Sequence, residues 1–239
     1  MIFGIAIASG SAAVTPPQLH APDGFFSLPV ALLMWVLTVA VLAVAVQRTN
    51  QRLDDRAVPL LGVMAAFIFA AQMFNFPVVA GSSGHLLGGV LAAVLLGPWA
   101  ATLVMACVVA VQALVFQDGG LVSLGANIFN MGVVGTLGGY AVYRALVRLG
   151  GDRAGVRLPA AGIAGWLAVM AGALTTTLQL AASGSTELAL ALPPMLGFHL
   201  LIGIGEALIT VAALSFIAVT RADLLRLGEP DGGAVAAGA

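Results

Sequence analysis

The sequence predicts an all-α integral membrane protein with about seven transmembrane helices, its N-terminus outside and its C-terminus in the cytoplasm. Of the 239 residues, 61% are hydrophobic and only 8% are charged. A water-soluble domain carries roughly 25% charged residues, so this chain cannot cover a globule with a solvated surface. Many of the 30 glycines lie within apolar runs, which is typical of membrane helices that pack closely through small residues.

Seven apolar segments are candidates for membrane spans, which need about 20 apolar residues and range from roughly 17 to 25. In chain order these segments are residues 28–47, 58–78, 83–96, 99–116, 128–143, 159–181 and 192–220. The third is short and rich in glycine, and Gly97 and Pro98 separate it from the fourth. Because glycine and proline end helices and begin turns, this pair predicts a tight hairpin between the two segments.

The arginines predict the orientation of the chain, because short cytoplasmic loops carry an excess of basic residues. All nine basic residues are arginines, namely Arg48, Arg52, Arg56, Arg144, Arg148, Arg153, Arg157, Arg221 and Arg226. With seven spans and an external N-terminus, they all fall in cytoplasmic loops or in the C-terminal tail. If the third segment did not cross, the loop between the fifth and sixth spans would carry four arginines to the outside. Seven crossings are therefore the better prediction.

The chain divides into three regions. Residues 1–18 contain a short apolar run without the basic start of a secretory signal, and we interpret them as a leader or a wrongly assigned start. Residues 19–220 form the transmembrane domain. Residues 221–239 are expected to be a disordered cytoplasmic tail, because residues 228–239 are rich in glycine and alanine and have no periodicity.

The absence of lysine excludes two kinds of chemistry. A Walker A phosphate loop requires a lysine, and so does a lysine Schiff base, yet the chain has none. Any ATP-driven work must therefore come from a partner, and we expect a chain that is not an enzyme and has no ATPase site of its own. The single Cys107 permits neither an internal disulfide nor a cysteine-based metal cage.

Three histidines are candidates for metal ligands. His20 precedes the first predicted span, His85 lies at the outer end of the third, and His199 lies several residues into the seventh. A lone histidine in a membrane commonly hydrogen-bonds between helices, whereas two histidines that converge from separate segments favour a metal site. Ionisable groups within a membrane are functional candidates in either case.

Four other polar residues could support such a site. Asp118 precedes two glycines, which is a turn signal, so formation of a turn is its more common role. Asn127 and Asn130 are three apart and share a helix face, from which they could hydrogen-bond to another helix or brace a ligand loop. Glu206 lies deep in the seventh predicted span and needs a buried partner. We expect a structural or coupling role for Glu206 rather than direct ligation.

Six collinear motifs between Leu19 and Thr220 carry a resemblance to a known family. They are HAPDGF at 20–25, GSSGHLLGG at 81–89, LGPW at 96–99, QALVFQDGGL at 112–121, LGANIFNM at 124–131 and HLLIGIGE at 199–206. Together they resemble the CbiM/NikM family, the substrate-capture membrane components of energy-coupling-factor (ECF) transporters for cobalt and nickel. The resemblance makes residues 19–220 a metal-capture domain.

The resemblance implies a metal site with four nitrogen ligands. In the family, the ligands are the terminal amine, the amide nitrogen and imidazole of the second residue, and a histidine that opens a later span. These positions correspond to Leu19, His20 and His85. Four nitrogens suit square-planar Ni²⁺, although affinity order does not decide between Ni²⁺ and Co²⁺. Because 18 residues precede Leu19, a free amine there requires cleavage after Gln18 or translation from the Leu19 codon.

Such a site needs supporting residues, and the resemblance also implies partners. Asp118, Asn127 and Asn130 are candidates to hold the histidine ring in place, and His199 and Glu206 are candidates for support or coupling. The expected partners are a transmembrane coupling subunit (the T component), cytoplasmic ATPase subunits and, for cobalt, a small accessory membrane subunit. The chain is expected in the cell membrane, where it transports Ni²⁺ or Co²⁺ without a resident cofactor or a nucleic-acid partner.

Two alternatives belong to other functional classes. Residues 81–84 read as G-x-S-G, so Ser83 and His199 could be the nucleophile and base of an intramembrane serine protease. However, no oxyanion donors are evident, and the other motifs would be unexplained. The second alternative is a purely structural membrane subunit, which predicts that no histidine substitution affects transport.

Overall fold

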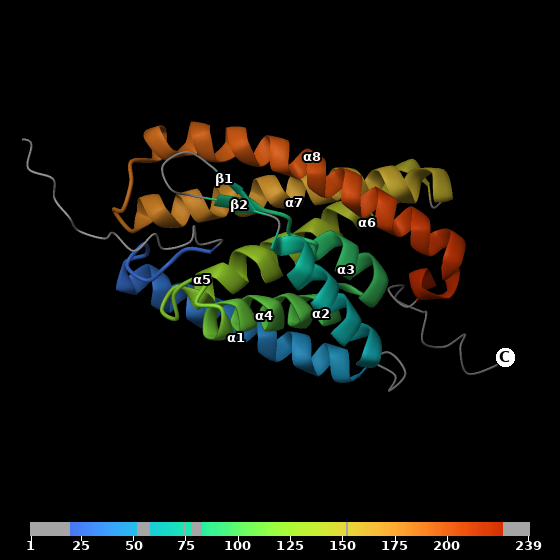
Figure 1. The fold of residues 1–239 in the computed structure, drawn as a ribbon, viewed down its shortest axis with the longest axis horizontal. Helices are drawn as coiled ribbons and strands as arrows, with labels where there is room; N and C mark the ends of the chain where they lie inside the picture. The colour runs from blue at the N-terminus through green and yellow to red at the C-terminus, as the bar shows by residue number, and fades with distance from the viewer. Residues whose placement is uncertain (1–19, 52–57, 74, 78–82, 152, 227–239) are drawn as a thin grey trace, which may run out of the picture.

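The computed structural model describes residues 20–51, 58–73, 75–77, 83–151 and 153–226 of the chain. They form an elongated bundle of helices with one short two-stranded hairpin (Figure 1). In chain order the elements are α1 (Leu28–Asn50), α2 (Val58–Gln72), β1 (Asn75–Pro77), β2 (Ser83–His85), α3 (Gly89–Leu96), α4 (Pro98–Val115), α5 (Leu124–Ile128), the π-helix η3 (Phe129–Gly138), α6 (Gly139–Gly150), α7 (Ala154–Ala182), α8 (Leu188–Thr220) and the 3-10 helix η4 (Ala222–Arg226).

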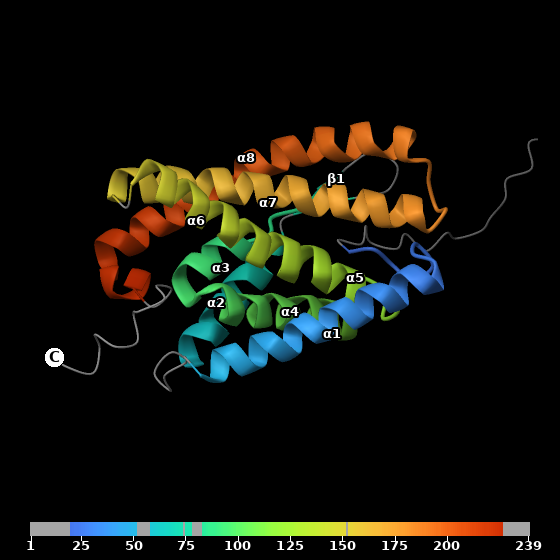
Figure 2. The same ribbon diagram turned by 180° about the vertical axis from the view of Figure 1, so that it is seen from behind.

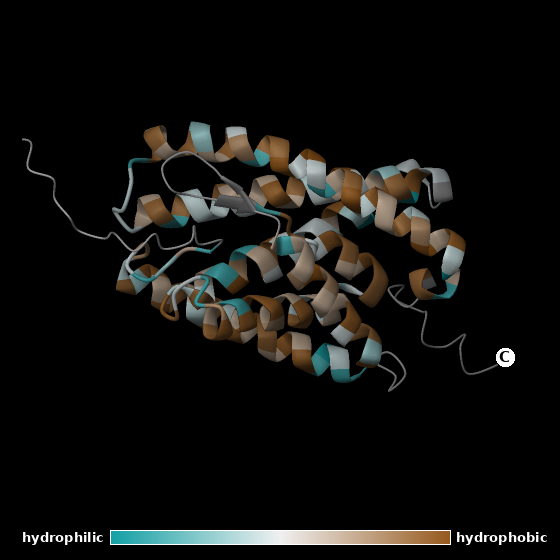
Figure 3. Cartoon of the chain, in the orientation of Figure 1, coloured by the Kyte–Doolittle hydropathy of each residue, from teal (hydrophilic) through white to brown (hydrophobic). Residues whose placement is uncertain are grey.

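Four helices in the described part of the chain, α1, α4, α7 and α8, are long and apolar enough to cross a membrane. They confirm the first, fourth, sixth and seventh predicted spans. Hydrophobic residues cover most of the length of these helices (Figure 3). Large apolar side chains such as Val36 on α1 and Phe216 on α8 are exposed, as expected of helices surrounded by lipid tails, which are as apolar as leucine.

The fifth predicted span is one unbroken helical segment from Leu124 to Gly150, and it is longer than predicted at both ends. It consists of α5, η3 and α6. Glycine allows neighbouring helices to approach it closely, because a β-carbon at Gly139 would lie 2.5 Å from Val90 Cγ2 on α3 and 3.0 Å from Ala168 Cβ on α7. Such close approach through small residues is how membrane helices commonly associate.

The second and third predicted spans are wrong as continuous helices. Helix α2 ends at Gln72 rather than at residue 78, and the third segment contains only the eight-residue helix α3 after an extended start. At 1.5 Å per residue, such a helix reaches about 12 Å, which is too short for a hydrocarbon core of about 30 Å. Gly88, the N-cap of α3, has a φ angle of 74°, a left-handed conformation that prevents the helix from beginning earlier.

A short hairpin replaces the end of the second predicted span and the start of the third, and the buried helix α3 forms the rest of the third. Strands β1 and β2 pair antiparallel with Asn75 opposite His85, and the chain then returns through α3. All eight residues of α3 are buried, and the helix packs against α4, η3, α6 and α7. Non-helical backbone at membrane depth is tolerated only where protein buries it or where it lines a cavity, and hydropathy along the chain does not report that condition.

The described arginines gather at one end of the bundle. Figures 1 and 2 show the end of α1, the α3–α4 turn, the α6–α7 connection and the end of α8 at this end, and the α4–α5 and α7–α8 connections at the other. Arg48 lies in the last turn of α1, Arg148 lies in the last turn of α6, Arg153 precedes α7 and Arg221 ends α8. Helix α2 runs away from this end and α3 runs back to it. The described arginines therefore lie at one end of the bundle, as seven crossings predicted.

The beginning of the predicted tail is ordered. Residues 222–226 form η4, and Leu225 packs against the hydrophobic core. Arg221 forms an ion pair with Asp223 at 2.8 Å, and this hydrogen-bonded partner lowers the pKa of the exposed Asp223 carboxyl. The prediction of disorder from residue 221 is therefore wrong for this stretch, because local contacts stabilise it. The predicted leader at residues 1–18 and the rest of the tail at 227–239 lie outside the described residues.

Candidate metal centre

Asp23 fixes the first described residues to the loop between α4 and α5. Its carboxylate accepts hydrogen bonds from the backbone N–H groups of Leu121 at 3.1 Å, Val122 at 2.8 Å and Ser123 at 3.0 Å. The Ser123 hydroxyl donates to the Pro22 carbonyl at 2.9 Å. A carboxylate that satisfies the free N–H groups ahead of a helix is a strong local anchor. The backbone at Pro22 and Asp23 is thereby held against the bundle just before α5.

Two glycines allow the backbone of His20 and Ala21 to lie against this loop. Gly119 has a φ angle of 97°, and a β-carbon at this position would lie 2.8 Å from His20 Cβ. The Gly120 N–H donates to the Ala21 carbonyl at 3.1 Å, and Asn127 Nδ2 donates to the same oxygen at 3.1 Å. The turn therefore needs glycine both for its left-handed conformation and for the close approach of the N-terminal segment.

The rings of His20 and His85 meet inside the bundle. Their centroids are 5.0 Å apart, and the ring planes are inclined by 55°. His20 is 6% exposed, and its Nε2 lies 3.0 Å from Sδ of Met131 on η3. Its Nδ1 has no hydrogen-bond partner among the described residues and lies 3.5 Å from one oxygen of Asp118. The other Asp118 oxygen accepts a hydrogen bond from the His20 backbone N–H at 3.2 Å.

The neighbours of the His85 ring indicate which of its nitrogens carries a lone pair. His85 Nδ1 lies 2.8 Å from the Leu86 carbonyl oxygen. Because a carbonyl only accepts, Nδ1 carries the proton of the neutral ring and Nε2 has the lone pair. The His20 ring has an acceptor beside each nitrogen, the Met131 thioether at Nε2 and an Asp118 carboxylate oxygen at Nδ1, and a metal at Nδ1 requires the tautomer with its proton on Nε2. Two imidazole lone pairs from separate segments, with a carboxylate beside one of them, are a donor set that suits a divalent transition metal.

The two asparagines have different roles. Asn127 braces the N-terminal segment through the Ala21 carbonyl, which is the ligand-loop alternative of the sequence analysis. Asn130 exchanges two hydrogen bonds of 2.8 Å with Gln179 and donates another to Thr176 at 3.0 Å. Asn130 therefore joins η3 to α7, which is the interhelical alternative.

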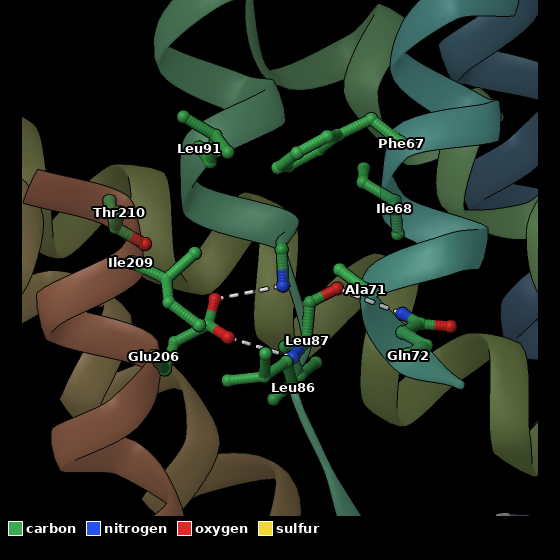
Figure 4. Close-up of a pocket in the computed structure, with 11 residues that line it drawn as sticks. Phe67, Ile68, Ala71, Gln72, Leu86, Leu87, Leu91, Glu206, Ile209 and Thr210 are labelled. Carbon is green, nitrogen blue, oxygen red and sulfur yellow. Dashed lines mark hydrogen bonds between the residues drawn. The ribbon is translucent and has the colours of Figure 1, made fainter. Parts of the chain in front are cut away.

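His199 and Glu206 both lie on α8. His199 is half-buried, and its Nδ1 lies 2.8 Å from the Met195 carbonyl one turn earlier in the same helix. Glu206 is 2% exposed and accepts hydrogen bonds from the N–H groups of Leu87 and Gly88, each at 2.8 Å (Figure 4). Glu206 thus contacts the backbone that follows His85.

Not every candidate of the sequence analysis can be placed. Leu19 and the side chain of Ser83 lie outside the described residues. Three of the remaining candidates lie near the two histidines: Asp118 and Asn127 contact the backbone at His20 and Ala21, and Glu206 contacts the backbone after His85. Asn130 and His199 hydrogen-bond elsewhere, to α7 and within α8.

Three residues around this site were missed by the sequence analysis. Met131 contacts the His20 ring, and Gln72 and Gln112 are fully buried in helices α2 and α4. A signal for the two glutamines was present, because a polar side chain within an apolar helix must find a hydrogen-bond partner. Met131 lacked such a signal, since methionine is an ordinary residue of apolar helices.

Comparison with known proteins identifies the family. The sequence model of one protein family, described as the cobalt uptake substrate-specific transmembrane region (CbiM), matches residues 20–224. The chain belongs to the CbiM family. The resemblance inferred from the six sequence motifs is confirmed, and the match covers the bundle together with the segment that carries His20.

Named relatives and a solved structure agree with CbiM membership. A protein of Archaeoglobus fulgidus named as a fused nickel transport protein, NikMN, is 41% identical over 209 residues, which cover 87% of this chain and 68% of that protein. A cobalt transport protein CbiM of Geobacter sulfurreducens is 34% identical over 247 residues, which cover 99% of this chain and 69% of that protein. The crystal structure of a truncated transition metal transporter matches with a TM-score of 0.78 at 33% identity, over 84% of this chain and 98% of that one.

Membership in the CbiM family decides the broad class of the protein. With its long apolar helices, the chain is a multi-pass membrane protein of a nickel and cobalt transport family, and a transporter rather than an enzyme. The relatives named above are metal transport proteins, so they give the serine protease alternative no support.

Proposed function

We propose that this chain is the substrate-capture permease component of an ECF transporter and that it binds Ni²⁺ or Co²⁺ for translocation across the membrane. The observation that carries the proposal is the convergence of two imidazoles from distant parts of the sequence, with ring centroids 5.0 Å apart, within a CbiM-family bundle. The names of the relatives support the two candidate ions.

The proposed ligands are Leu19, His20 and His85. If Leu19 is the first residue of the mature chain, its amine, the His20 amide nitrogen and His20 Nδ1 can form fused chelate rings, and His85 Nε2 can complete the square. In support of this set, His20 Nδ1 is buried and has no described hydrogen-bond partner. Asp118, Asn127 and Asp23 hold the backbone of the chelating segment. A metal-binding histidine commonly needs such outer contacts to fix its ring.

The proposed orientation follows from the arginine-rich end of the bundle. Basic residues flank the cytoplasmic ends of membrane helices, so this end faces the cytoplasm, and the opposite end, with the N-terminus of α1, faces outward. The chain then works with a T component and cytoplasmic ATPase subunits, and with a small accessory membrane subunit if the ion is Co²⁺. In this proposal the metal is cargo, and the chain needs no resident cofactor, no ATPase site of its own and no nucleic-acid partner.

Uptake of radiolabelled Ni²⁺ and Co²⁺ tests this function. Cells that express the chain together with its coupling and ATPase subunits should accumulate at least one ion, and cells with an ATPase-inactive partner should not. Binding of the same ion to the purified chain, measured by calorimetry, should require His20 and His85. Saturable uptake of neither ion, with all subunits present in the membrane, contradicts the proposal. Concentrative uptake by the purified chain alone in liposomes would contradict the need for partners.

A further inference from the structure

The N-terminus of helix α3 lies in the interior of the bundle and is capped by a residue from another helix. The N–H groups of Leu87 and Gly88, ahead of the first turn, both donate to the Glu206 carboxylate on α8, each at 2.8 Å. Figure 4 shows the two carboxylate oxygens pointing at these two backbone nitrogens. A helix N-terminus has unsatisfied N–H groups and a partial positive charge, and both features favour a carboxylate at this position.

The same peptide is held from its other side. Gln72 on α2 donates to the Leu87 carbonyl at 2.9 Å, and Gln112 on α4 donates to the Gln72 side-chain oxygen at 3.0 Å. The side chains of Gln72 and Gln112 are fully buried, as is nearly all of Glu206. Helices α2 and α8 therefore both hydrogen-bond to the backbone at Leu87, and α4 supports this contact through Gln72.

The Leu87–Gly88 backbone follows the candidate ligand His85 closely in the sequence. We refer to the hydrogen bonds that Glu206 and Gln72 make with this backbone as the clamp. Only Leu86 separates His85 from Leu87, and the Leu86 carbonyl is the group that lies 2.8 Å from His85 Nδ1. Leu86 to Gly88 have no helical or strand structure, so the contacts of their peptide groups, rather than a helical ladder, determine where this backbone lies. A displacement of Leu87 would move the carbonyl that orients the His85 ring.

We infer that Glu206 is the positioning residue of the metal site: its carboxylate holds the Leu87–Gly88 backbone so that the His85 imidazole faces His20. The inference rests on the proposed function for the identity of the site, but the clamp itself does not depend on a metal. Since Glu206 belongs to α8, a movement of α8 relative to α3 is transmitted to His85 through these two hydrogen bonds. The lining of the pocket beside the carboxylate, with Phe67 and Ile209 among its residues, is otherwise mainly apolar.

Glu206→Gln tests the clamp with almost no change of shape. A glutamine offers one acceptor oxygen and an NH₂ group, so one of the two N–H donors faces another donor. Loss of one hydrogen bond to a charged acceptor corresponds to a change of about tenfold or more in an equilibrium. Glu187→Gln is the matched control, because it makes the same chemical change at an exposed residue at the start of α8.

Hydrogen exchange of the full chain in lipid nanodiscs, without metal, measures the clamp directly. We expect Glu206→Gln to accelerate exchange of the Leu87 and Gly88 amides about tenfold, with exchange in α4 and α7 unchanged and the Glu187→Gln control like the wild type. Unchanged exchange at these amides would overturn the inference. If Glu206→Gln does not fold, Glu206→Asp, which withdraws the carboxylate from the Leu87 and Gly88 N–H groups by one methylene, replaces it with the same two outcomes.

Ni²⁺ affinity then tests whether the clamp acts through His85. Competition with a metal-binding dye should show a Kd about tenfold higher for Glu206→Gln than for wild type. In a His85→Ala background, where weak binding through the N-terminal segment is measured, Glu206→Gln should cause no further loss. An equal loss in both backgrounds, or no loss in either, overturns the positioning role. A wild-type chain that binds neither Ni²⁺ nor Co²⁺ would refute the proposed function, while the exchange experiment would still judge the clamp.

Discussion

One carboxylate, that of Asp118, faces both nitrogen atoms of His20 that we propose as metal ligands. One of its oxygens accepts a hydrogen bond from the His20 backbone N–H at 3.2 Å, and the other lies 3.5 Å from His20 Nδ1. Asp118 is itself largely buried. The backbone and the ring of His20 are therefore oriented together by one side chain, as the proposed metal site requires.

Replacing each histidine with alanine should distinguish the metal ligands from a histidine that does not bind the metal. His20→Ala and His85→Ala should each abolish high-affinity Ni²⁺ or Co²⁺ binding, because each removes one imidazole of the proposed set. His199→Ala should weaken binding less, because the described hydrogen bond of His199 is to its own helix. Calorimetric titration of the three purified variants measures this order. A His199→Ala variant that loses as much affinity as His85→Ala would place a further ligand on α8.

Metal affinity should fall as the pH is lowered. The imidazoles and the terminal amine bind metal only when deprotonated, so protons compete with the ion. The loss of affinity should therefore grow steadily as the pH is lowered, because each ligand nitrogen must be free of its proton to bind the ion. The apparent Kd measured from pH 8 to pH 5 checks the slope. A Kd that stays constant over this interval argues against nitrogen ligands.

The mature protein should begin at residue 19. The proposed chelate needs a free amine next to His20, so mass spectrometry of the protein purified from its membrane should find Leu19, or a methionine in its place, at the N-terminus. Processing and initiation at the Leu19 codon both lead to this result. An intact Met1 on protein that binds Ni²⁺ tightly through His20 would falsify the free-amine mechanism.

Gly120→Ala should weaken metal binding without unfolding the bundle. A β-carbon at this position would collide with the Asp23 carboxylate and backbone, and Asp23 is the anchor of the segment that begins with His20. We expect a rise of roughly tenfold in the Kd for the metal, which corresponds to the loss of one charge-assisted hydrogen bond. Gly62→Ala on α2 is the control, because a β-carbon there would meet nothing within 4 Å. Equal affinities of the two variants would show that the anchor does not support the site.

Glu206→Gln should impair transport more than it impairs equilibrium binding. With metal in excess of the altered Kd, uptake should remain below that of the wild type, because the connection between α8 and His85 is weakened even when the site is filled. Uptake of radiolabelled metal at saturating concentration, compared with Glu187→Gln, measures the difference. If uptake recovers fully at saturation, Glu206 serves affinity alone and has no part in coupling.

Much of the fold was predictable because hydropathy is a local property of the chain. The apolar lengths of α1, α4, α7 and α8 predicted those spans, and the arginines predicted that their basic flanks share one end of the bundle. The same reasoning failed at α2 and α3, where apolar composition was taken as evidence of full-length helices. The non-helical backbone ahead of α3 is stabilised by Glu206, which accepts the hydrogen bonds of Leu87 and Gly88 but lies far from them in the sequence.

The sequence by itself determined that this is a multi-pass membrane protein of the CbiM family and which histidines are candidates for metal ligands, because composition and motifs are properties of the sequence alone. Only the tertiary structure decided which of those histidines meet. His20 reaches His85 because Asp23 binds three N–H groups of the α4–α5 loop, Gly119 leaves room for the His20 backbone, and Glu206 fixes the peptide after His85. Each of these contacts joins segments about a hundred residues apart, and no local pattern specifies how such segments pair inside a bilayer.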